Sequence, residues 1–379
     1  MSLPQPCIVL AAGGTGGHVF PAEALAGALA TRGLDTVLLT DSRGRDFRGA
    51  KQIQVIAGGG IAGLGTAARL RSVGALAVGF AQALWHLRRV APQVVVGFGG
   101  YASLPPMLAA VLLRIPTLLH EQNAVLGRAN RLLARRVKRI AVAFDQVARL
   151  PASAASRTVR IGMPVRPAFA AIAGTAYQPA TDGEPIRLLI LGGSQGAQIF
   201  STLLPDAIAH IDPDLRGRLQ VSQQCRPETL ELTRTAYLEL GVEAELATFF
   251  DDVPLRMATS QLVIARSGAS TIAELTAAGR PALLVPYPYA IDDHQSANAQ
   301  AIEAAGGGWM LPQATLTPEA LAARITALLR QPATLIAAAA AAQAAGTIDA
   351  AQHLADLVIS MIPAAGGCSA AALPKQGAA

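Results

Sequence analysis

Short apolar runs alternate with amphipathic segments along most of the chain, which predicts a parallel β-sheet whose strands are joined by helices. Residues 262–265 read LVIA and are followed by the small-residue turn RSGA, a helix opened by Ser270 and Thr271, and an apolar strand over 282–285. Similar runs predict strands at 7–12, 36–40, 94–96, 117–119, 140–143, 186–191, 220–222 and 247–249. Helices are expected at 21–31, 317–329, 333–345 and 348–362.

Glycine-rich loops follow the first strand of each half of the chain. GGTGGH (13–18) follows strand 7–12, and GGSQGA (192–197) follows strand 186–191. Glycine tolerates positive φ and lets the backbone approach a ligand closely, and N–H groups at a helix N-terminus bind anions. Two halves built on one plan predict an α/β protein with two doubly wound, Rossmann-like domains facing an interdomain cleft.

Three successive strand ends in the first half carry glycine-rich or polar sequences, namely GGTGGH, GFGGY (97–101) and HEQN (120–123). In open α/β sheets, ligands bind outside the carboxyl ends of the strands, so these sequences predict one rim of a cleft. In the second half, Glu274 lies one turn into the helix after RSGA, where it can reach the ribose of a nucleotide. An ordinary capped strand-turn-helix unit is the alternative for that stretch taken alone.

Composition adds a charge asymmetry to this picture. The chain has 379 residues, 52% of them hydrophobic and 4% aromatic, as in an apolar two-domain α/β protein. Up to Val165 there are 19 Lys and Arg against 6 Asp and Glu, and from Arg166 onward 12 against 19. The basic first half favours an anionic partner, and the few aromatics and missing nucleic-acid module favour a membrane surface over nucleic acid. Cys7, Cys225 and Cys368 show no metal or disulfide spacing, which suits a reducing cytosol.

The expected membrane attachment is peripheral. The apolar stretches at 73–85 and 101–113 are shorter than the ~20 residues that a spanning helix needs. Ile61 and Leu64 lie in a glycine-rich loop, and Phe80 and Trp85 follow on an apolar helical stripe flanked by arginines. We expect these four side chains to contact lipid. A helix that faces the core with solvated arginines is the alternative for most of the stripe.

A dinucleotide-binding interpretation competes for the first glycine loop. Asp41 ends the second strand about 20 residues after the loop, as an acid does in the dinucleotide fingerprint. Val19, however, stands where that fingerprint needs glycine or alanine, and His18 has no role in binding a pyrophosphate. An NAD-dependent oxidoreductase is therefore a less favoured alternative.

Eight blocks of sequence occur in an order that identifies a family. They are GGTGGHVFPA (13–22), GFGGYASLP (97–105), HEQNAVLGRAN (120–130), GMPVR (162–166), LGGSQGA (191–197), FFDD (249–252), ARSGASTIAEL (265–275) and DDHQSANA (292–299). Together they closely resemble the MurG family of GT-B N-acetylglucosaminyltransferases over about residues 7–360. The resemblance implies transfer of GlcNAc from UDP-GlcNAc to the C4 hydroxyl of MurNAc in undecaprenyl-diphosphate-MurNAc-pentapeptide, which converts lipid I to lipid II with inversion.

The resemblance also implies a set of donor-site residues. In it, the backbone of Phe250 reads the uracil edge, Glu274 binds the ribose hydroxyls and Gln295 contacts the sugar. The full implied set is Thr15, Gly16, Gly17, Asn123, Arg166, Ser194, Phe250, Ala269, Ser270, Thr271, Ile272, Ala273, Glu274 and Gln295.

Inverting transfer requires a base for the acceptor hydroxyl and groups that stabilise the departing diphosphate. We expect His18 to be the base because its ordinary pKa lies near the working pH, with Glu121 as the second candidate. The sequences predicted to line the cleft carry no Asp-x-Asp metal site, so no metal or other cofactor is expected. Instead, Ser194, the glycine-loop amides, Arg166 and the helix start at 269–271 would stabilise the diphosphate. The pairs at 251–252 and 292–293 are expected at helix starts, and the basic run 128–139 on a solvated face.

These inferences predict how the chain is organised. Residues 1–165 would form the acceptor- and membrane-binding domain and 166–346 the UDP-GlcNAc domain, with a helix at about 347–362 packing back on the first domain and a disordered tail over 363–379. The protein would lie on the cytoplasmic side of the inner membrane, with other cell-wall synthesis and division proteins as candidate partners. A related glycolipid synthase acting on diacylglycerol and a catalytically inactive nucleotide-sugar or lipid-binding module are the remaining alternatives.

Overall fold

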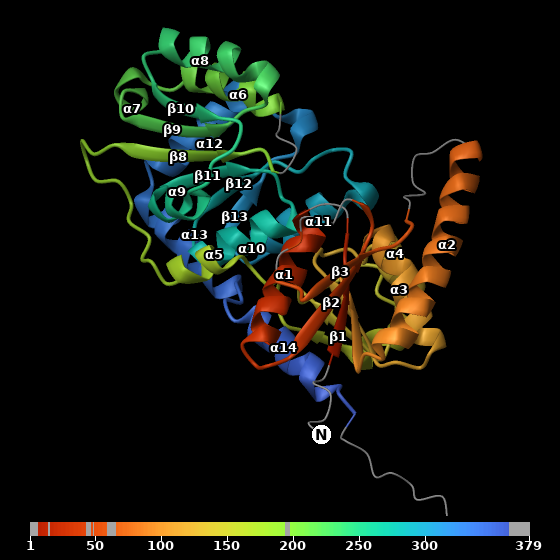
Figure 1. The fold of residues 1–379 in the computed structure, drawn as a ribbon. Coiled ribbons are helices and arrows are strands. Elements are labelled where there is room, and N and C mark those ends of the chain that lie inside the picture. The colour runs from red at the N-terminus through yellow and green to blue at the C-terminus, as the bar shows by residue number, and fades with distance from the viewer. Residues whose placement is uncertain are drawn as a thin grey trace, which may run out of the picture.

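Two wholly parallel β-sheets form the framework of the protein (Figure 1). The computed structural model describes residues 7–13, 16–42, 47, 49–58, 66–193 and 198–363. The first sheet has the strand order β3-β2-β1-β4-β5-β6-β7 and the second the order β10-β9-β8-β11-β12-β13. In the first sheet the strands are β1 (Cys7–Ala11), β2 (Asp35–Thr40), β3 (Gln52–Val55), β4 (Val94–Gly97), β5 (Thr117–Glu121), β6 (Arg139–Val142) and β7 (Thr158–Arg160). In the second they are β8 (Ile186–Leu191), β9 (Leu219–Gln224), β10 (Glu243–Ala247), β11 (Leu262–Ala265), β12 (Ala282–Leu284) and β13 (Gly308–Met310).

The strand order of each sheet reverses once, between β1 and β4 in the first and between β8 and β11 in the second. At these points β1 pairs in register with β4, Leu10 opposite Val96, and β8 with β11, Ile190 opposite Ile264. Such a reversal opens a crevice at the carboxyl ends of the strands, where ligands bind in this architecture. The two sheets therefore confirm the expected fold class, and each supplies one ligand crevice.

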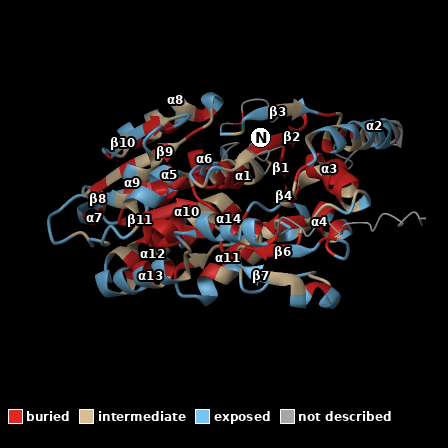
Figure 2. Ribbon diagram, turned by 60° about the horizontal axis from the view of Figure 1, so that its bottom comes forward, coloured by how far each residue is buried: buried red, intermediate tan, exposed pale blue. Residues whose placement is uncertain are grey.

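Helices cover both faces of both sheets (Figure 1). Because the central strands are buried on both sides, they read as continuous apolar runs: Ile8 and Leu10 pack into one core cluster and Val9 into another. Figure 2 shows the buried residues gathered in the central strands and in α10, while the outer helices expose much of their surface. The helices are α1 (Gly16–Ala30), α2 (Thr66–Val90), α3 (Gly100–Leu112), α4 (Arg128–Leu133), α5 (Pro167–Ile172), α6 (Gln198–Ala209), α7 (Pro213–Arg216), α8 (Leu230–Glu239), α9 (Val253–Thr259), α10 (Ala269–Ala278), α11 (His294–Ala304), α12 (Pro318–Leu329), α13 (Pro332–Ala345) and α14 (Ala350–Ser360).

The last helix returns to the first sheet. Leu354, Ala355 and Val358 of α14 are fully buried in the same cluster as Ile8 and Leu10, and α14 packs along α1. The chain thus crosses between the two sheets twice, once before α5 and once between α13 and α14.

Residues 333–345 and 348–362 were expected to be helices of the fold, yet the stretch Pro332–Ser360 has a length and a mean hydropathy, 1.2, that would allow it to cross a membrane. In the structure it consists of two helices, α13 and α14, separated at residues 346–349. Leu335 of α13 lies in the core of the second sheet, and Leu354 of α14 lies in the core of the first. The inner faces of both helices are therefore part of the two domain cores.

Several element boundaries differ from the sequence-based expectation. The strands at 262–265 and 186–191 are confirmed as β11 and β8, but α1 begins at Gly16, five residues before the predicted start. Pro21 consequently lies inside α1, where its missing N–H leaves out one helical bond. The strand predicted at 247–249 was wrong, because β10 ends at Ala247. Strands β3, β7 and β13 were not predicted, since each is short and two of them carry few buried residues.

Candidate active site

His18 lies in the first turn of α1, at the carboxyl end of β1. Its imidazole stands against the Gly99-Gly100 turn that opens α3. Both glycines have positive φ, 83° and 71°, and a Cβ on Gly100 would come within 3.3 Å of His18 Cδ2. The GFGGY sequence thus provides both the backbone conformation and the space that the imidazole occupies.

The surroundings of His18 favour a neutral imidazole. Its Nδ1 lies 3.2 Å from the Gln122 Oε1. Burial lowers the pKa of His18, and His294 on α11 acts in the same direction, whereas the Glu121 charge and the hydrogen bond with Gln122 oppose the shift. A pKa below the usual value of about 6.5 leaves His18 mainly uncharged at pH 7 and able to accept a proton.

Glu121 is placed differently from His18, because its carboxylate is turned into the protein and is only 1% exposed. Oε1 accepts the backbone N–H of Asn123 at 3.1 Å and its side-chain amide at 3.3 Å. Oε2 accepts the N–H of Gly127 and the amide of Asn130, both at 2.8 Å. Four donors occupy the carboxylate, so its geometry suits holding the loop after β5 rather than proton exchange with a substrate.

Asn298 joins the loop after β5 to the second sheet. Its Oδ1 accepts the N–H of Ala124 at 2.8 Å, and its Nδ2 donates to the Asn123 Oδ1 at 3.1 Å and to the Ser267 carbonyl at 3.0 Å. Asn298 is fully buried. No role was expected for this residue of the DDHQSANA block, because only the folded chain brings it beside HEQN.

Arg166 and Glu274 meet between the two sheets. The Arg166 guanidinium donates to Glu274 Oε1 from Nε at 3.1 Å and from Nη2 at 2.9 Å. It also lies over the rings of Phe20, on α1, and Phe169, on α5. Burial raises the pKa of Glu274, and the Arg166 charge counteracts this rise. Two residues expected in the donor site are therefore brought together as an ion pair on the inner side of α10.

Helix α10 presents an uncapped N-terminus. Gly268 occupies the N-cap, and no side chain caps the first-turn N–H groups. These N–H groups suit an anion, as expected for the RSGA turn. The six expected residues from Ala269 to Glu274 do not share one face. Ala269, Ile272 and Ala273 line a cavity of about 560 Å³ between the sheets, whereas Glu274 turns to Arg166.

Gln295 is held beside the α10 turn from both sides. Its Oε1 accepts the N–H of Tyr287 at 2.9 Å, and its carbonyl accepts the hydroxyl of Ser267 at 2.8 Å. The Pro-Tyr-Pro-Tyr loop is thus fixed to the start of α11, which places Gln295 next to the turn expected to bind the donor.

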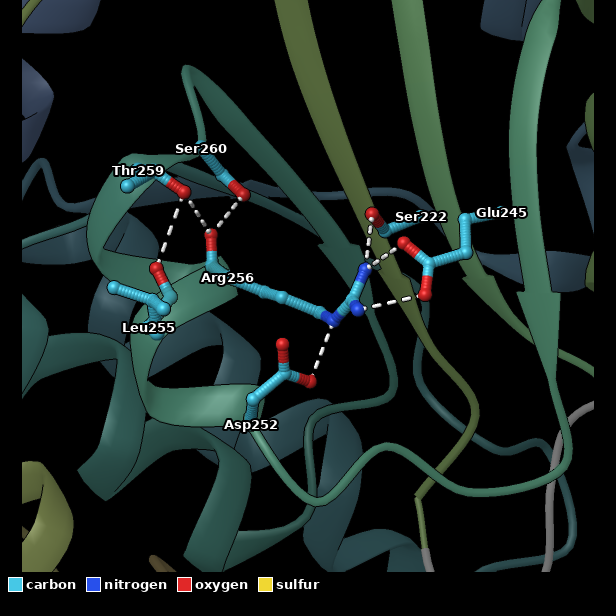
Figure 3. A network of polar contacts seen from close by, with 7 residues as sticks. All are labelled: Ser222, Glu245, Asp252, Leu255, Arg256, Thr259 and Ser260. Atoms are coloured by element: carbon cyan, nitrogen blue, oxygen red, sulfur yellow. Dashed lines mark hydrogen bonds and ion pairs between the residues drawn. The ribbon is translucent and has the colours of Figure 1, made fainter.

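The FFDD segment is fixed by an ion-pair network on Arg256 (Figure 3). The guanidinium donates to both oxygens of Glu245, at 2.6 and 2.7 Å, and to Asp252 at 2.7 Å. It lies 4.2 Å from the centre of the Phe250 ring, which is 6% exposed. Asp252 stands at the N-cap of α9, as expected, but its carboxylate pairs with Arg256 instead of capping the helix. The sequence did not single out Arg256, although its position four residues after Asp252 on a helix permits this pair.

The role expected for Asp292 was wrong. It lies at a helix start as expected, but it was interpreted as a carboxylate that offsets the helix dipole. The basic run 128–139 is on a solvated face as expected at Arg135, Arg136, Lys138 and Arg139. Asp292 instead has a positive φ of 56° and accepts ion pairs from Arg128, Arg131 and Arg149 of the first domain. These arginines hold its pKa at about 2. Asp292 therefore belongs to the contact between the two halves of the cleft.

Some expected residues lie outside the described part of the chain or away from the cleft. Thr15, Ser194, Ile61 and Leu64 are outside the described residues. Gly16 and Gly17 form the start of α1. Trp85 is 56% exposed on α2, whereas Phe80 is partly buried against the core of the first sheet. Among the described residues, no group of three His, Cys, Asp or Glu side chains is arranged to hold a metal ion.

Comparison with known proteins decides the family. Residues 8–142 match the N-terminal domain of glycosyltransferase family 28, and residues 187–354 match its C-terminal domain. The chain is 55% identical, over 93% of its length and 91% of the relative's, to the UDP-N-acetylglucosamine--N-acetylmuramyl-(pentapeptide) pyrophosphoryl-undecaprenol N-acetylglucosamine transferase of Rhodospirillum rubrum. It is 52% identical to the protein of the same name from Paramagnetospirillum magneticum, over 96% of this chain and 99% of that one.

This chain belongs to the MurG family. A crystal structure of Acinetobacter baumannii MurG has a TM-score of 0.75 and 31% identity, and the match covers 94% of this chain and 100% of that one. The GT-B fold and the family expected from the sequence are thereby confirmed. MurG membership also disfavours the dinucleotide-dependent oxidoreductase that Asp41 had suggested.

The Asp292 cluster gives a pH-dependent prediction. Asp292→Asn should lower the thermal midpoint at pH 7 by roughly 2–6 °C, because three arginines lose their carboxylate partner. Since the native pKa is depressed, the stabilisation is full above the unfolded pKa of about 4 and disappears as the pH falls through about 2. The gap between variant and wild type should therefore close over that interval in scanning calorimetry.

Asp293→Asn is the matched control for this experiment. Asp293 is adjacent and exposed, and its carboxylate accepts a hydrogen bond from Ser296 within the same helix. Equal losses in the two variants, or a gap that does not change with pH, would show that Asp292 does not stabilise the contact between the halves.

Proposed function

We propose that this protein is the inverting glycosyltransferase that moves GlcNAc from UDP-GlcNAc to the C4 hydroxyl of MurNAc in undecaprenyl-diphosphate-MurNAc-pentapeptide. Relatives named for this reaction are 48–55% identical to the chain. The observation that carries the proposal is the cleft itself. A histidine from the first domain, favoured in its neutral form, faces the same cleft as the uncapped N-terminus of α10 and the ion pair between partly exposed Arg166 and buried Glu274.

The donor binds on the side of the second sheet. The first-turn N–H groups of α10 and the Arg166 guanidinium provide positive potential for the diphosphate of UDP, which leaves with the electron pair of the broken anomeric C–O bond. Glu274, held by Arg166, accepts hydrogen bonds from the ribose hydroxyls. The Phe250 segment, fixed by Arg256, forms the wall for uracil, and Gln295 contacts the sugar. Thr15 and Ser194 complete the proposed donor set.

The acceptor is activated on the side of the first sheet. His18 takes the proton of the C4 hydroxyl as that oxygen attacks the anomeric carbon from the face opposite UDP, so the configuration inverts in one displacement. Glu121 assists this proton transfer in two ways. Its negative charge stabilises the protonated imidazole of His18, and its hydrogen bonds hold Asn123 and Asn130 in place. The geometry thus favours His18 over Glu121 as the base.

The decisive experiment is transfer of labelled GlcNAc from its UDP donor to a short-chain lipid I analogue. Diacylglycerol as acceptor and a nicotinamide cofactor with candidate hydroxy acids serve as controls for the alternative functions. We expect label only in the lipid I analogue. Incorporation into diacylglycerol, or none into the lipid I analogue, would refute the proposed function.

His18→Ala tests the assignment of the base. We expect kcat to fall by ~10²–10⁴ while the affinity for UDP-GlcNAc stays nearly unchanged, since the imidazole acts on the acceptor. Steady-state kinetics and calorimetric titration of the donor measure the two quantities. A fully active variant would rule His18 out.

We also infer that α2 attaches the protein to an anionic membrane surface. Val78 and Trp85 are more than half exposed and lie on one face of α2, and Arg88 and Arg89 are exposed beside them. The Arg89 guanidinium lies 5.4 Å from the centre of the Trp85 ring. Apolar side chains beside cations are the pattern of interfacial binding and support a peripheral attachment, which we propose to be on the cytoplasmic face of the inner membrane.

Vesicle sedimentation tests this attachment. Trp85→Ala should weaken binding to phosphatidylglycerol-containing vesicles severalfold, and high salt should weaken binding of the wild type. Leu238→Ala is the control, because Leu238 is 71% exposed on α8 of the other domain. If Trp85→Ala and Leu238→Ala bind like wild type, α2 is not the attachment surface.

A further inference from the structure

Gln122 lies directly behind His18, and its surroundings fix the orientation of its amide group. Its Nε2 lies 3.0 Å from the Phe98 carbonyl oxygen and 3.1 Å from the His120 carbonyl oxygen. Carbonyl oxygens only accept hydrogen bonds, so the NH2 group must face them. The opposite orientation would bring the Gln122 oxygen against two carbonyl oxygens at the same distances. The side chain is 1% exposed, so water cannot compensate for that repulsion.

His120 reinforces this orientation from its other side. Its ring is fully buried, and burial lowers the pKa of His120 to about 4, so the ring is neutral. His120 Nε2 lies 3.1 Å from the Gly162 carbonyl oxygen and must therefore carry the proton. His120 Nδ1 is then an acceptor, and it faces the Gln122 NH2 group at 3.0 Å.

The orientation of the Gln122 amide determines the tautomer of His18. With the NH2 group of Gln122 turned inward, Oε1 faces His18 Nδ1 at 3.2 Å. An amide oxygen can only accept, so the neutral His18 ring must carry its proton on Nδ1. The lone pair is then on Nε2, the atom that would take the proton of the acceptor hydroxyl.

We propose that Gln122 is a positioning residue that fixes His18 in the Nδ1–H tautomer, through a hydrogen-bonded chain that runs from the Gly162 carbonyl by way of His120. The inference rests on the proposed function, because it gives His18 the part of the base. In contrast to a carboxylate partner, the amide of Gln122 orients the ring without adding a negative charge. His18 can therefore keep the lowered pKa that burial gives it.

The hydrogen-bonded chain begins where the polypeptide passes from the first domain to the second. Gly162 precedes the crossing into the second domain and has a positive φ of 83°, and a Cβ there would come within 2.4 Å of the Thr347 Cβ. Thr347 lies at the second crossing, between α13 and α14. Both connections between the domains thus come together at Gly162, the residue whose carbonyl group starts the hydrogen-bonded chain.

The charged and titratable groups around His18 define what a pH profile must separate. Glu121 and His120 face it from β5, and His294 faces it from α11. All three of these residues are retained in a Gln122 variant. Since the base must be neutral, kcat/KM should rise as the pH increases through the pKa of His18. This rising part of the pH profile is the acid limb, and its position depends on the group that accepts the hydrogen bond from Nδ1.

Two substitutions of Gln122 should move the acid limb in opposite directions. Gln122→Met keeps the volume but removes the acceptor, so the acid limb should move to lower pH, and kcat should fall about 10- to 100-fold because the ring is no longer held in one tautomer. Gln122→Glu places a carboxylate against Nδ1 and should move the limb to higher pH. The KM for UDP-GlcNAc should change by less than about twofold in both variants.

Gln93→Met is the matched control. Gln93 lies just before β4, and its buried Oε1 has no hydrogen-bond partner among the described residues. The proposal would be overturned if Gln93→Met lost as much activity as Gln122→Met and neither variant shifted the acid limb. Gln122 would then affect activity only through the stability of the protein.

Nitrogen NMR of the wild-type protein, labelled with ¹⁵N at its histidines, reads the tautomer directly and needs no variant at Gln122 to fold. The His18 signals, assigned by their loss in His18→Ala, should show a protonated Nδ1 and an unprotonated Nε2 at pH 8. A protonated Nε2 would overturn the proposal even in a protein that transfers GlcNAc normally. Failure of wild-type transfer would instead refute the proposed function.

Discussion

The buried carboxylate of Glu121 is the constraint on which the acceptor side of the cleft depends. Burying a charge is costly unless donors surround it, and here four N–H groups do so. Those donors lie on the loop after β5 and on α4, so the carboxylate sets the shape of that loop. Through Asn123 and Asn298 the same loop is tied to the RSGA turn of the other domain. One buried charge thereby links the loop beside His18 to the turn before α10, the two sides on which the acceptor and the donor are proposed to bind.

The two halves of the cleft have different electrostatic arrangements. In the proposed reaction, the first half supplies His18 and the nearby Glu121 carboxylate to accept a proton, whereas the second supplies the first-turn N–H groups of α10 and Arg166 to stabilise the negative charge that develops on the diphosphate. Arg166 connects the two halves, because it follows the first domain in sequence, lies over the Phe20 ring of α1 and forms an ion pair with Glu274 of α10. The two parallel sheets share one strand order over six strands, and side chains that follow their strand ends meet between the domains, as Arg166 with Glu274 and Asn123 with Asn298 do.

The sequence predicted most of what depends on local pattern. Apolar runs such as LVIA at 262–265 identified the buried strands, and glycine loops at strand ends identified the rims of the cleft. Element edges were less predictable, as α1 and β10 show, because glycine turns and short exposed strands carry little periodic signal. The partners of polar side chains could not be predicted at all. Asp292 with its three arginines, Asn298 with Asn123, and Gln122 with His18 each join residues more than 100 positions apart in the sequence.

In the proposed reaction, one cleft performs a single displacement on the donor sugar, with the acceptor hydroxyl activated from the side opposite UDP. The linkage formed by the wild-type protein tests it most directly. NMR of the product made from UDP-GlcNAc and a lipid I analogue should show one GlcNAc joined in β configuration to the C4 oxygen of MurNAc. An α linkage, or attachment at another hydroxyl, would contradict the account.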